Sequence, residues 1–174
     1  MPNKKRASKW PRNIIKDIFM YQDVDIDSLP GDVLKDLEYM FSRIHPNQHK
    51  VLLWFYKDGY LMKEMTKLDG GFTYDYITAC KEYGIKNLQR LSHLLVIGYD
   101  NFDKGYHIEE WPIVLLVDDL FAISYNALER AGIITVGDVL QCTKEDLIKF
   151  NRVGEITLKK IEDKLKKYGL SLNK

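Results

Sequence analysis

The last third of the chain constrains its fold most strongly, because short helical patterns alternate there with turns built from an apolar residue and a glycine. Residues 124–172 read SYNALERAGIITVGDVLQCTKEDLIKFNRVGEITLKKIEDKLKKYGLSL. The turns are Ala131-Gly132-Ile133 and Val153-Gly154. Glycine permits the left-handed or close-approach backbone that a tight hairpin between two helices needs. This stretch is therefore expected to form several short helices joined by tight turns.

The turn at Val153-Gly154 is also expected to bind an anion. The helix that follows begins with free backbone N–H groups and the positive end of its dipole, and together these favour a phosphate. This arrangement is typical of a helix-hairpin-helix that contacts the DNA backbone. Thr135 and Thr143 are predicted N-caps of the two short helices that precede the hairpin.

From about residue 117 to residue 172, the protein resembles the C-terminal domain of the bacterial RNA polymerase alpha subunit. The matching strings, in order, are SYNALERAGI, TVGDVL, TKEDLIKF, the VG hairpin and LKKIEDKLKKYGLSL. The resemblance implies a small helical module that docks into the minor groove of upstream promoter DNA.

The DNA-contact positions of that family carry over only in part. Three residues match its polar or glycine contacts, namely Asn126, Gly154 and Thr157. Isoleucines, Ile123 and Ile156, stand where the family has an arginine and a lysine. Because phosphate and minor-groove binding depend on cations, this loss lowers the expected DNA affinity or favours contact with a protein. The nearby cations expected to restore some charge are Arg152, Lys159 and Lys160.

Residues 29–98 show the order of elements that is typical of a helix-turn-helix. Helices are expected over residues 32–44, 47–56 and 61–68, followed by a turn at Gly70-Gly71 and a longer helix that Thr73 caps. The strings HPNQHKVLLWFYKDGYLMKEMTKL and FTYDYITACKEYGIKNLQRLSHLL loosely resemble region four of bacterial sigma factors. The resemblance implies that the longer helix reads promoter DNA.

The start of that longer helix lacks the arginines typical of the family. Bidentate reading of guanine needs Arg or Lys, and the first two turns have neither. Tyrosines at positions two apart face different sides of a helix, so one of the pair is expected to pack, and the other is a candidate to hydrogen-bond phosphates or stack on bases. The DNA-binding candidates in this region are Thr73, Tyr74, Tyr76 and Lys81.

The sequence thus predicts an all-α protein in which a helix-turn-helix domain precedes a small helix-hairpin-helix domain. Six cations and no acid lie within residues 1–16, which indicates either a tail that tracks nucleic acid or a solvated terminus. The predicted segments are a basic arm (1–28), a sigma region four-like domain (29–98), an acidic linker (99–112) and an alpha-like domain (113–174).

Catalytic and metal-binding patterns are weak. His45 and His49 are four residues apart, but Pro46 interrupts a helix between them. No nucleophile elbow or phosphate-binding P-loop is present, so the protein is expected to be neither an enzyme nor a carrier of a cofactor or metal. Without an apolar signal region or membrane span, a bacterial cytoplasmic, nucleoid-associated location is expected.

Two functions remain open. The first is a transcription-associated protein that binds double-stranded promoter DNA, alone or together with RNA polymerase, through both modules. The second is a protein-interaction factor that docks on RNA polymerase core, a sigma factor or another transcription factor and binds little DNA. The missing cations favour the second, and the two family resemblances favour the first, which is the predicted function. No membrane partner is expected.

Overall fold

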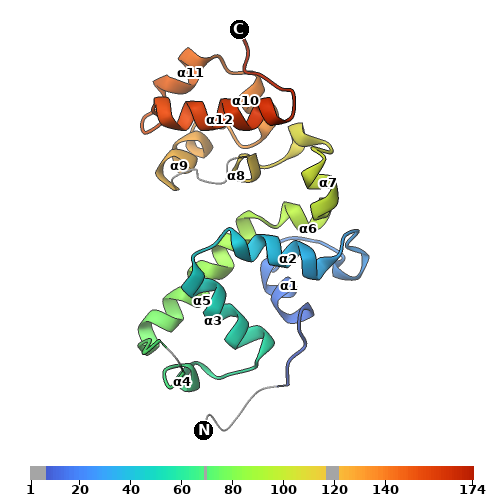
Figure 1. Cartoon of the computed structure of the whole chain (residues 1–174), viewed down its shortest axis with the longest axis vertical. Coiled ribbons are helices and arrows are strands. Elements are labelled where there is room, and N and C mark those ends of the chain that lie inside the picture. Colours follow the sequence, from blue (N-terminus) through green and yellow to red (C-terminus); the bar gives the residue numbers. More distant parts are fainter. Residues whose placement is uncertain (1–6, 69, 117–121) are drawn as a thin grey trace. The chain divides into compact units, whose positions relative to one another are not determined.

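A computed structural model describes residues 7–68, 70–116 and 122–174 of the protein, without the side chains of Ala122 and Ile123. Within these ranges the regular elements are all helical, and extended pairing is limited to one isolated bridge between Pro112 and Thr135 (Figure 1). The predicted all-α class is therefore confirmed. The protein divides into two compact units, residues 1–99 and residues 100–174. Every helix in the described ranges is too short or too polar to cross a lipid bilayer.

The first unit is built around a long helix, α5, that packs against α3. The elements of this unit are α1 (Arg12–Ile18), η1 (Ile26–Ser28), α2 (Val33–Ser42), α3 (Pro46–Leu52), the π-helical η2 (Leu53–Lys57), α4 (Met62–Met65), α5 (Tyr74–Arg90) and α6 (His93–Ile97). Ile77 and Leu88 of α5 are fully buried. A Cβ atom added at Gly84 would lie 2.9 Å from Leu52 Cδ1, so glycine permits the close approach of α5 to α3.

Local capping explains why these helices begin where they do. The Asp32 carboxylate accepts hydrogen bonds from the backbone N–H groups of Leu34 and Lys35 at the start of α2. Pro46 opens α3, where its fixed φ is compatible with the first helical position and its missing N–H is not needed. The predicted cap of α5 is confirmed, because Thr73 Oγ1 accepts from the Tyr76 N–H at 3.2 Å.

The region predicted as a basic arm differs from the expectation. α1 buries Ile14, Ile15 and Ile18 in the first unit, because apolar residues at this spacing form one face of a helix. Helical structure therefore begins at Arg12. Lys4, Lys5 and Arg6 of the predicted arm lie outside the described residues.

The second unit begins earlier than expected. The elements are α7 (Tyr99–Asp103), η3 (Ile108–Glu110), α8 (Ile113–Leu116), α9 (Ala122–Arg130), α10 (Val136–Leu140), α11 (Lys144–Lys149) and α12 (Glu155–Lys167). The segment 99–112, predicted as a linker, is folded around the buried Trp111. Its ring stacks on Phe102 with centroids 4.6 Å apart, and its Nε1–H donates to the Tyr106 carbonyl at 2.9 Å. The acids of this segment are exposed while the rings of Phe102 and Trp111 enter the core, which explains the difference.

Two capping boxes fix the short helices before the hairpin. Thr135 and Asp138 form one at α10, and Thr143 and Asp146 form the other at α11. Both predicted N-caps are therefore confirmed. Backbone N–H groups of Thr135 and Ile134 donate to Asp138 and hold the pKa of its carboxyl below the ordinary value.

Candidate nucleic-acid interface

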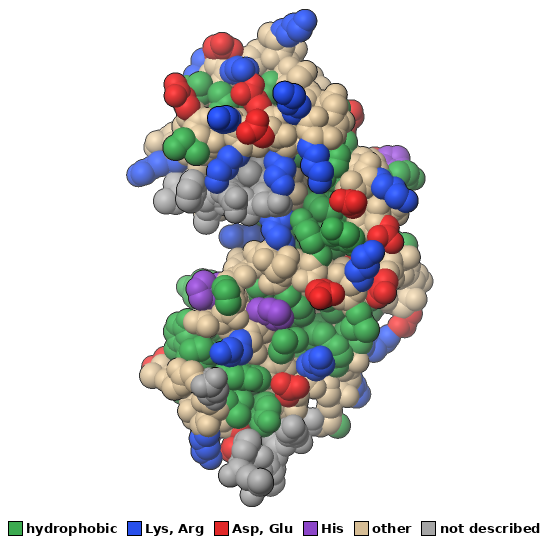
Figure 2. Space-filling view, in the orientation of Figure 1, with side chains coloured by type: hydrophobic (Ala, Val, Ile, Leu, Met, Phe, Trp, Pro, Cys, Tyr) green, Lys and Arg blue, Asp and Glu red, His purple; other side chains and the backbone are tan. Residues whose placement is uncertain are grey.

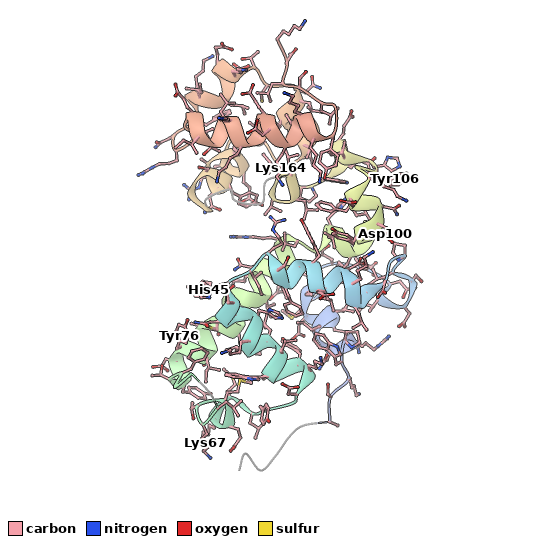
Figure 3. The ribbon with its side chains drawn as sticks, in the orientation of Figure 1. His45, Lys67, Tyr76, Asp100, Tyr106 and Lys164 are labelled. Carbon is pink, nitrogen blue, oxygen red and sulfur yellow. The ribbon has the colours of Figure 1, made fainter. Side chains whose placement is uncertain are left out.

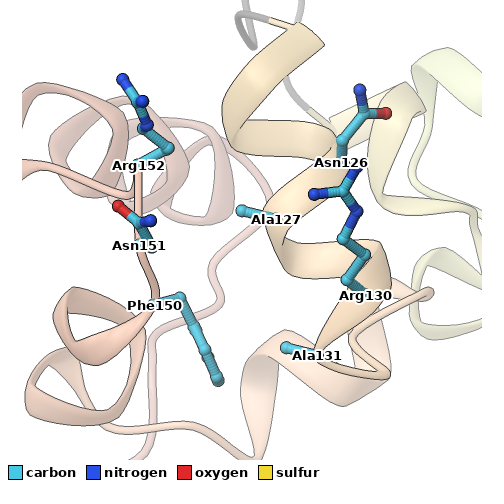
Figure 4. A pocket seen from close by; sticks show the side chains of 7 residues that line it. All are labelled: Asn126, Ala127, Arg130, Ala131, Phe150, Asn151 and Arg152. Atoms are coloured by element: carbon cyan, nitrogen blue, oxygen red, sulfur yellow. The ribbon is translucent and has the colours of Figure 1, made fainter.

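A surface groove of about 700 Å³ lies in the second unit between α9 and the loop that leads into α12. We call it the arginine groove; it is lined by Asn126, Ala127, Arg130, Ala131, Phe150, Asn151 and Arg152 (Figure 4). The four residues from α9 and its C-terminal end are spaced so that they share one helix face. Two of them are alanines, whose small side chains leave the groove open.

The arginine groove has the chemistry of an anion site. Arg130 and Arg152 are both exposed and rise from its two facing walls, and Asn126 and Asn151 add amide groups beside them (Figure 4). None of the seven described residues that line the groove is acidic. Guanidinium groups form paired, charge-assisted hydrogen bonds with phosphate oxygens, and amides supplement them in contacts to the DNA backbone.

A buried hydroxyl holds the loop wall of the groove in place. Ser124 Oγ donates a 2.8 Å hydrogen bond to the Arg152 carbonyl and lies 3.3 Å from Thr157 Oγ1. The loop needs such support because Arg152 has φ of +76°, in the left-handed region that non-glycine residues seldom occupy. The hydrogen bond therefore joins α9, which carries Ser124, to the strained residue of the opposite wall.

Thr157, predicted as a DNA contact, lies in the interior of the second unit. Its side chain is only 6% exposed and faces Ser124 in the interior, next to the buried Leu158. It occupies the inner side of α12, so it is not available to a ligand in this structure. Thr157 thus supports the hairpin from within.

Gly154 is exposed and serves as the N-cap of α12 with an extended backbone, φ −98° and ψ 177°. The sequence allowed either a left-handed backbone or a close approach at this glycine. The left-handed backbone is adopted by Arg152 instead. A Cβ at Gly154 would meet no atom within 4 Å, so the space over this helix end is open to an approaching group. Ile156, two residues later, is 71% exposed. The side chain of Ile123 lies outside the described residues.

The remaining cations predicted on α12 are separate from the arginine groove. Lys159 is exposed and Lys160 is half-buried, and neither lines the groove. On the face drawn in Figure 2, basic and acidic side chains are interspersed over the second unit. The structure thus brings Asn126 and Arg152 together and adds Arg130 and Asn151, which sequence reasoning missed. Arg130 follows Asn126 by four residues in one helical pattern, and that spacing was the available signal.

The candidates in the first unit are partly occupied by internal contacts. Tyr74 is 48% exposed and Tyr76 is 41% exposed. The Tyr76 hydroxyl accepts a 2.8 Å hydrogen bond from Asn47 Nδ2 at the start of α3, and Figure 3 shows Tyr76 on that side of the unit. Lys81 Nζ lies 4.4 Å from the ring centroid of Phe55. With Thr73 used as a cap, Tyr74 is the candidate on α5 best placed for an external contact.

Known proteins are similar to the part of the sequence that forms the arginine groove. Residues 119–167 match the family model for the C-terminal domain of the alpha subunit of bacterial RNA polymerase. The second unit therefore contains an alpha C-terminal-like domain. This match covers α9 to α12 and includes both walls of the groove.

Relatives of this domain are alpha subunits of RNA polymerase. The protein is 45% identical over 72 residues to the DNA-directed RNA polymerase subunit alpha of Carboxydothermus hydrogenoformans, covering 41% of this sequence and 22% of the relative. It is 48% identical over 70 residues to that of Clostridium acetobutylicum, covering 40% and 22%. The matched segment thus spans about a fifth of the length of these relatives. No solved structure matches. The resemblance of residues 29–98 to sigma region four stays a prediction.

Proposed function

We propose that this protein acts in transcription by binding duplex DNA through the arginine groove of its alpha C-terminal-like domain. The observation that carries the proposal is the placement of Arg130 and Arg152 on facing walls of one open groove. Two guanidinium groups in this arrangement suit two phosphates or the negative potential of a narrow minor groove. The alpha family has a lysine at the position of Ile156. The two arginines supply positive charge that this isoleucine lacks.

The N-terminus of α12 adds to this surface. Gly154 leaves its approach open, and a helix of 13 residues presents free backbone N–H groups at its first turn. Glu155 stands in that first turn and opposes a bound anion. The arginines are therefore assigned the main electrostatic role and the helix end a supporting one.

Fluorescence anisotropy with a labelled AT-rich duplex tests the proposal. The full-length protein is titrated at about 50 mM and at about 200 mM salt, because each phosphate contact contributes about 0.9 to the slope of log affinity against log salt. The double variant Arg130→Gln, Arg152→Gln is expected to lower this slope by about 1.8, equivalent to two phosphate contacts.

A charge-matched variant, Lys104→Gln with Lys174→Gln, removes two exposed cations of the same unit that do not line the arginine groove. Its slope is expected to stay near that of the parent protein. An equal decrease of the salt slope in the two double variants would show that DNA binding depends only on net charge. Undetectable binding of the parent protein at low salt would contradict the proposal as a whole.

The exposed Ile156 favours a second candidate function, docking on RNA polymerase or a transcription factor. An isoleucine that is 71% exposed in the first turn of α12 is suited to enter an apolar pocket of a protein partner. Pull-down of core polymerase by the tagged full-length protein is the test, with Ile156→Lys compared with Ile134→Lys, at a second exposed isoleucine. Loss of polymerase with Ile156→Lys alone supports docking, and no retention by the parent protein contradicts it.

A further inference from the structure

A second groove, of about 350 Å³, lies in the first unit between the N-terminal segment with α1 and the π-helical η2. We call it the lysine groove. The exposed Lys9 and Lys16 line it, together with the polar side chain of Asn13 and the ring of Phe55. Its lining residues are separate from those of the arginine groove and from the α5 residues predicted from the sequence.

Hydrogen bonds hold the walls of the lysine groove together. Ser8 Oγ donates to the Tyr56 carbonyl at 2.9 Å, and Asn13 Nδ2 donates to the same oxygen at 2.8 Å. These two bonds fasten the N-terminal segment to η2, across more than forty positions of sequence. π-Helical turns such as η2 occur frequently at functional sites. The groove is thus part of the folded unit.

The balance of charge around the lysine groove is positive. Lys81 Nζ lies 4.4 Å from the ring centroid of Phe55, which adds a third cation to Lys9 and Lys16. Asp17 is the acid among the described residues that line the groove, and its carboxylate accepts a hydrogen bond from the Tyr56 hydroxyl. An anion in the groove would meet two lysines of the lining and a third nearby.

The distribution of charge along the sequence points to the same place. Residues 1–99 contain 15 Lys or Arg and 12 Asp or Glu, a net charge of +3, whereas residues 100–174 contain 11 and 13, a net charge of −2. Residues 1–16 alone contribute six cations and no acid, so the rest of the first unit is net −3. The excess of cations in the N-terminal segment, which includes Lys9 and Lys16, therefore favours long-range attraction to a polyanion.

We infer that the lysine groove is a second contact for the phosphate backbone of the duplex that the arginine groove binds. This inference rests on the proposed function. Lysine ammonium groups attract phosphates as point charges, and contacts to phosphates do not distinguish bases, so the contact is independent of sequence and sensitive to salt. Two weak contacts within one protein raise the overall affinity, because the second binding event is intramolecular.

Protection of lysines from acetylation tests the inference directly. The full-length protein is treated with an amine-acetylating reagent, with and without a saturating AT-rich duplex, and modification is measured by peptide mass spectrometry. Lys9 and Lys16 are expected to be acetylated several-fold more slowly with duplex, while Lys104 and Lys174 keep their rates. Equal rates at Lys9 and Lys16 with and without bound duplex would overturn the inference.

Binding variants separate this inference from the proposed function. Lys9→Gln with Lys16→Gln is expected to lower the salt slope by about 1.8, since two phosphate contacts are lost. If this variant binds like the parent while Arg130→Gln, Arg152→Gln binds weakly, the lysine groove has no role and the proposed function stands. If only the lysine variant binds weakly, the arginine groove has no role. Circular dichroism of each variant checks that the fold is retained.

Discussion

Ser124 Oγ donates a 2.8 Å hydrogen bond to the carbonyl oxygen of Arg152, across 28 positions of sequence. Ser124 is 3% exposed, and its partner carries φ of +76°. One buried hydroxyl thus fixes the strained residue whose guanidinium lines the arginine groove. Stability of the second unit and geometry of its candidate DNA surface depend on the same contact.

Ser124→Ala is expected to lower both the stability of the second unit and its DNA affinity. The substitution removes a donor to the Arg152 carbonyl and a neighbour of the Thr157 hydroxyl, and buried polar groups left without partners cost about 1–3 kcal/mol each. Urea denaturation followed by circular dichroism measures the effect. Ser171→Ala, at an exposed serine, is the control and should be neutral. A neutral Ser124→Ala would show that the hydrogen bond does not hold the loop.

Arg152→Gly is expected to separate stability from binding. Glycine adopts a φ of +76° without steric cost, so relief of strain offsets the extra flexibility of the unfolded state. The free energy of unfolding should stay the same or rise by up to about 1 kcal/mol. DNA affinity should fall as it does in Arg152→Ala, because both lose the guanidinium. Lower stability of the glycine variant than of the alanine variant would contradict this account of the loop.

Local signals made much of the fold predictable from the sequence. The caps at Thr73, Thr135 and Thr143 depend on residues within three positions, and the structure contains all three. Arg130 was predictable on the same grounds, since it lies one helical turn after Asn126. Asn126 and Arg130 both lie on the groove-facing side of α9.

Contacts distant in sequence account for what was missed. Thr157 is buried because Ser124, 33 positions away, packs against it. The segment before Pro112 looked like a linker because it is acidic, yet Trp111 anchors it through an edge contact with the ring of Tyr168, 57 positions away. The lysine groove likewise forms only when the N-terminal segment meets η2. Neither composition nor periodicity contains this information.

Ile156→Lys is expected to raise DNA affinity. The side chain at this position is 71% exposed beside the open end of α12, so a lysine adds a cation without disturbing the core. Stability should change by no more than about 0.5 kcal/mol, and the salt slope should rise by about 0.9. Anisotropy titration compares the parent protein with this variant and with the control Ile134→Lys, at a position that is 55% exposed. An equal increase of DNA affinity in the two variants would show that a cation near the hairpin has no particular effect on binding.

Acid should destabilise the second unit through its capping boxes. Hydrogen bonds from the Thr135 and Ile134 N–H groups lower the pKa of Asp138, and those from the Thr143 N–H and hydroxyl lower the pKa of Asp146. Folding therefore favours the ionised carboxylates. Their contribution is complete above the ordinary carboxyl pKa of about 4 and is lost as pH falls through the lowered pKa.

The urea midpoint of Asp138→Asn tests this pH dependence. At neutral pH the variant should be less stable than the parent protein, and the difference should shrink at about pH 3 or below. Asp163→Asn, at an exposed aspartate of α12 outside both boxes, serves as the control. A difference that stays constant between the two pH values would contradict the ionisation argument.

An NMR titration shows, residue by residue, whether the second unit binds duplex DNA through the arginine groove. The ¹⁵N-labelled full-length protein is titrated with an AT-rich duplex at low salt, and changes in amide signals are followed residue by residue. The largest changes are expected at Asn126, Arg130, Asn151, Arg152 and Gly154, with small changes over α10. Unchanged signals at these five residues while the duplex binds elsewhere would show that the arginine groove is not the DNA-binding surface.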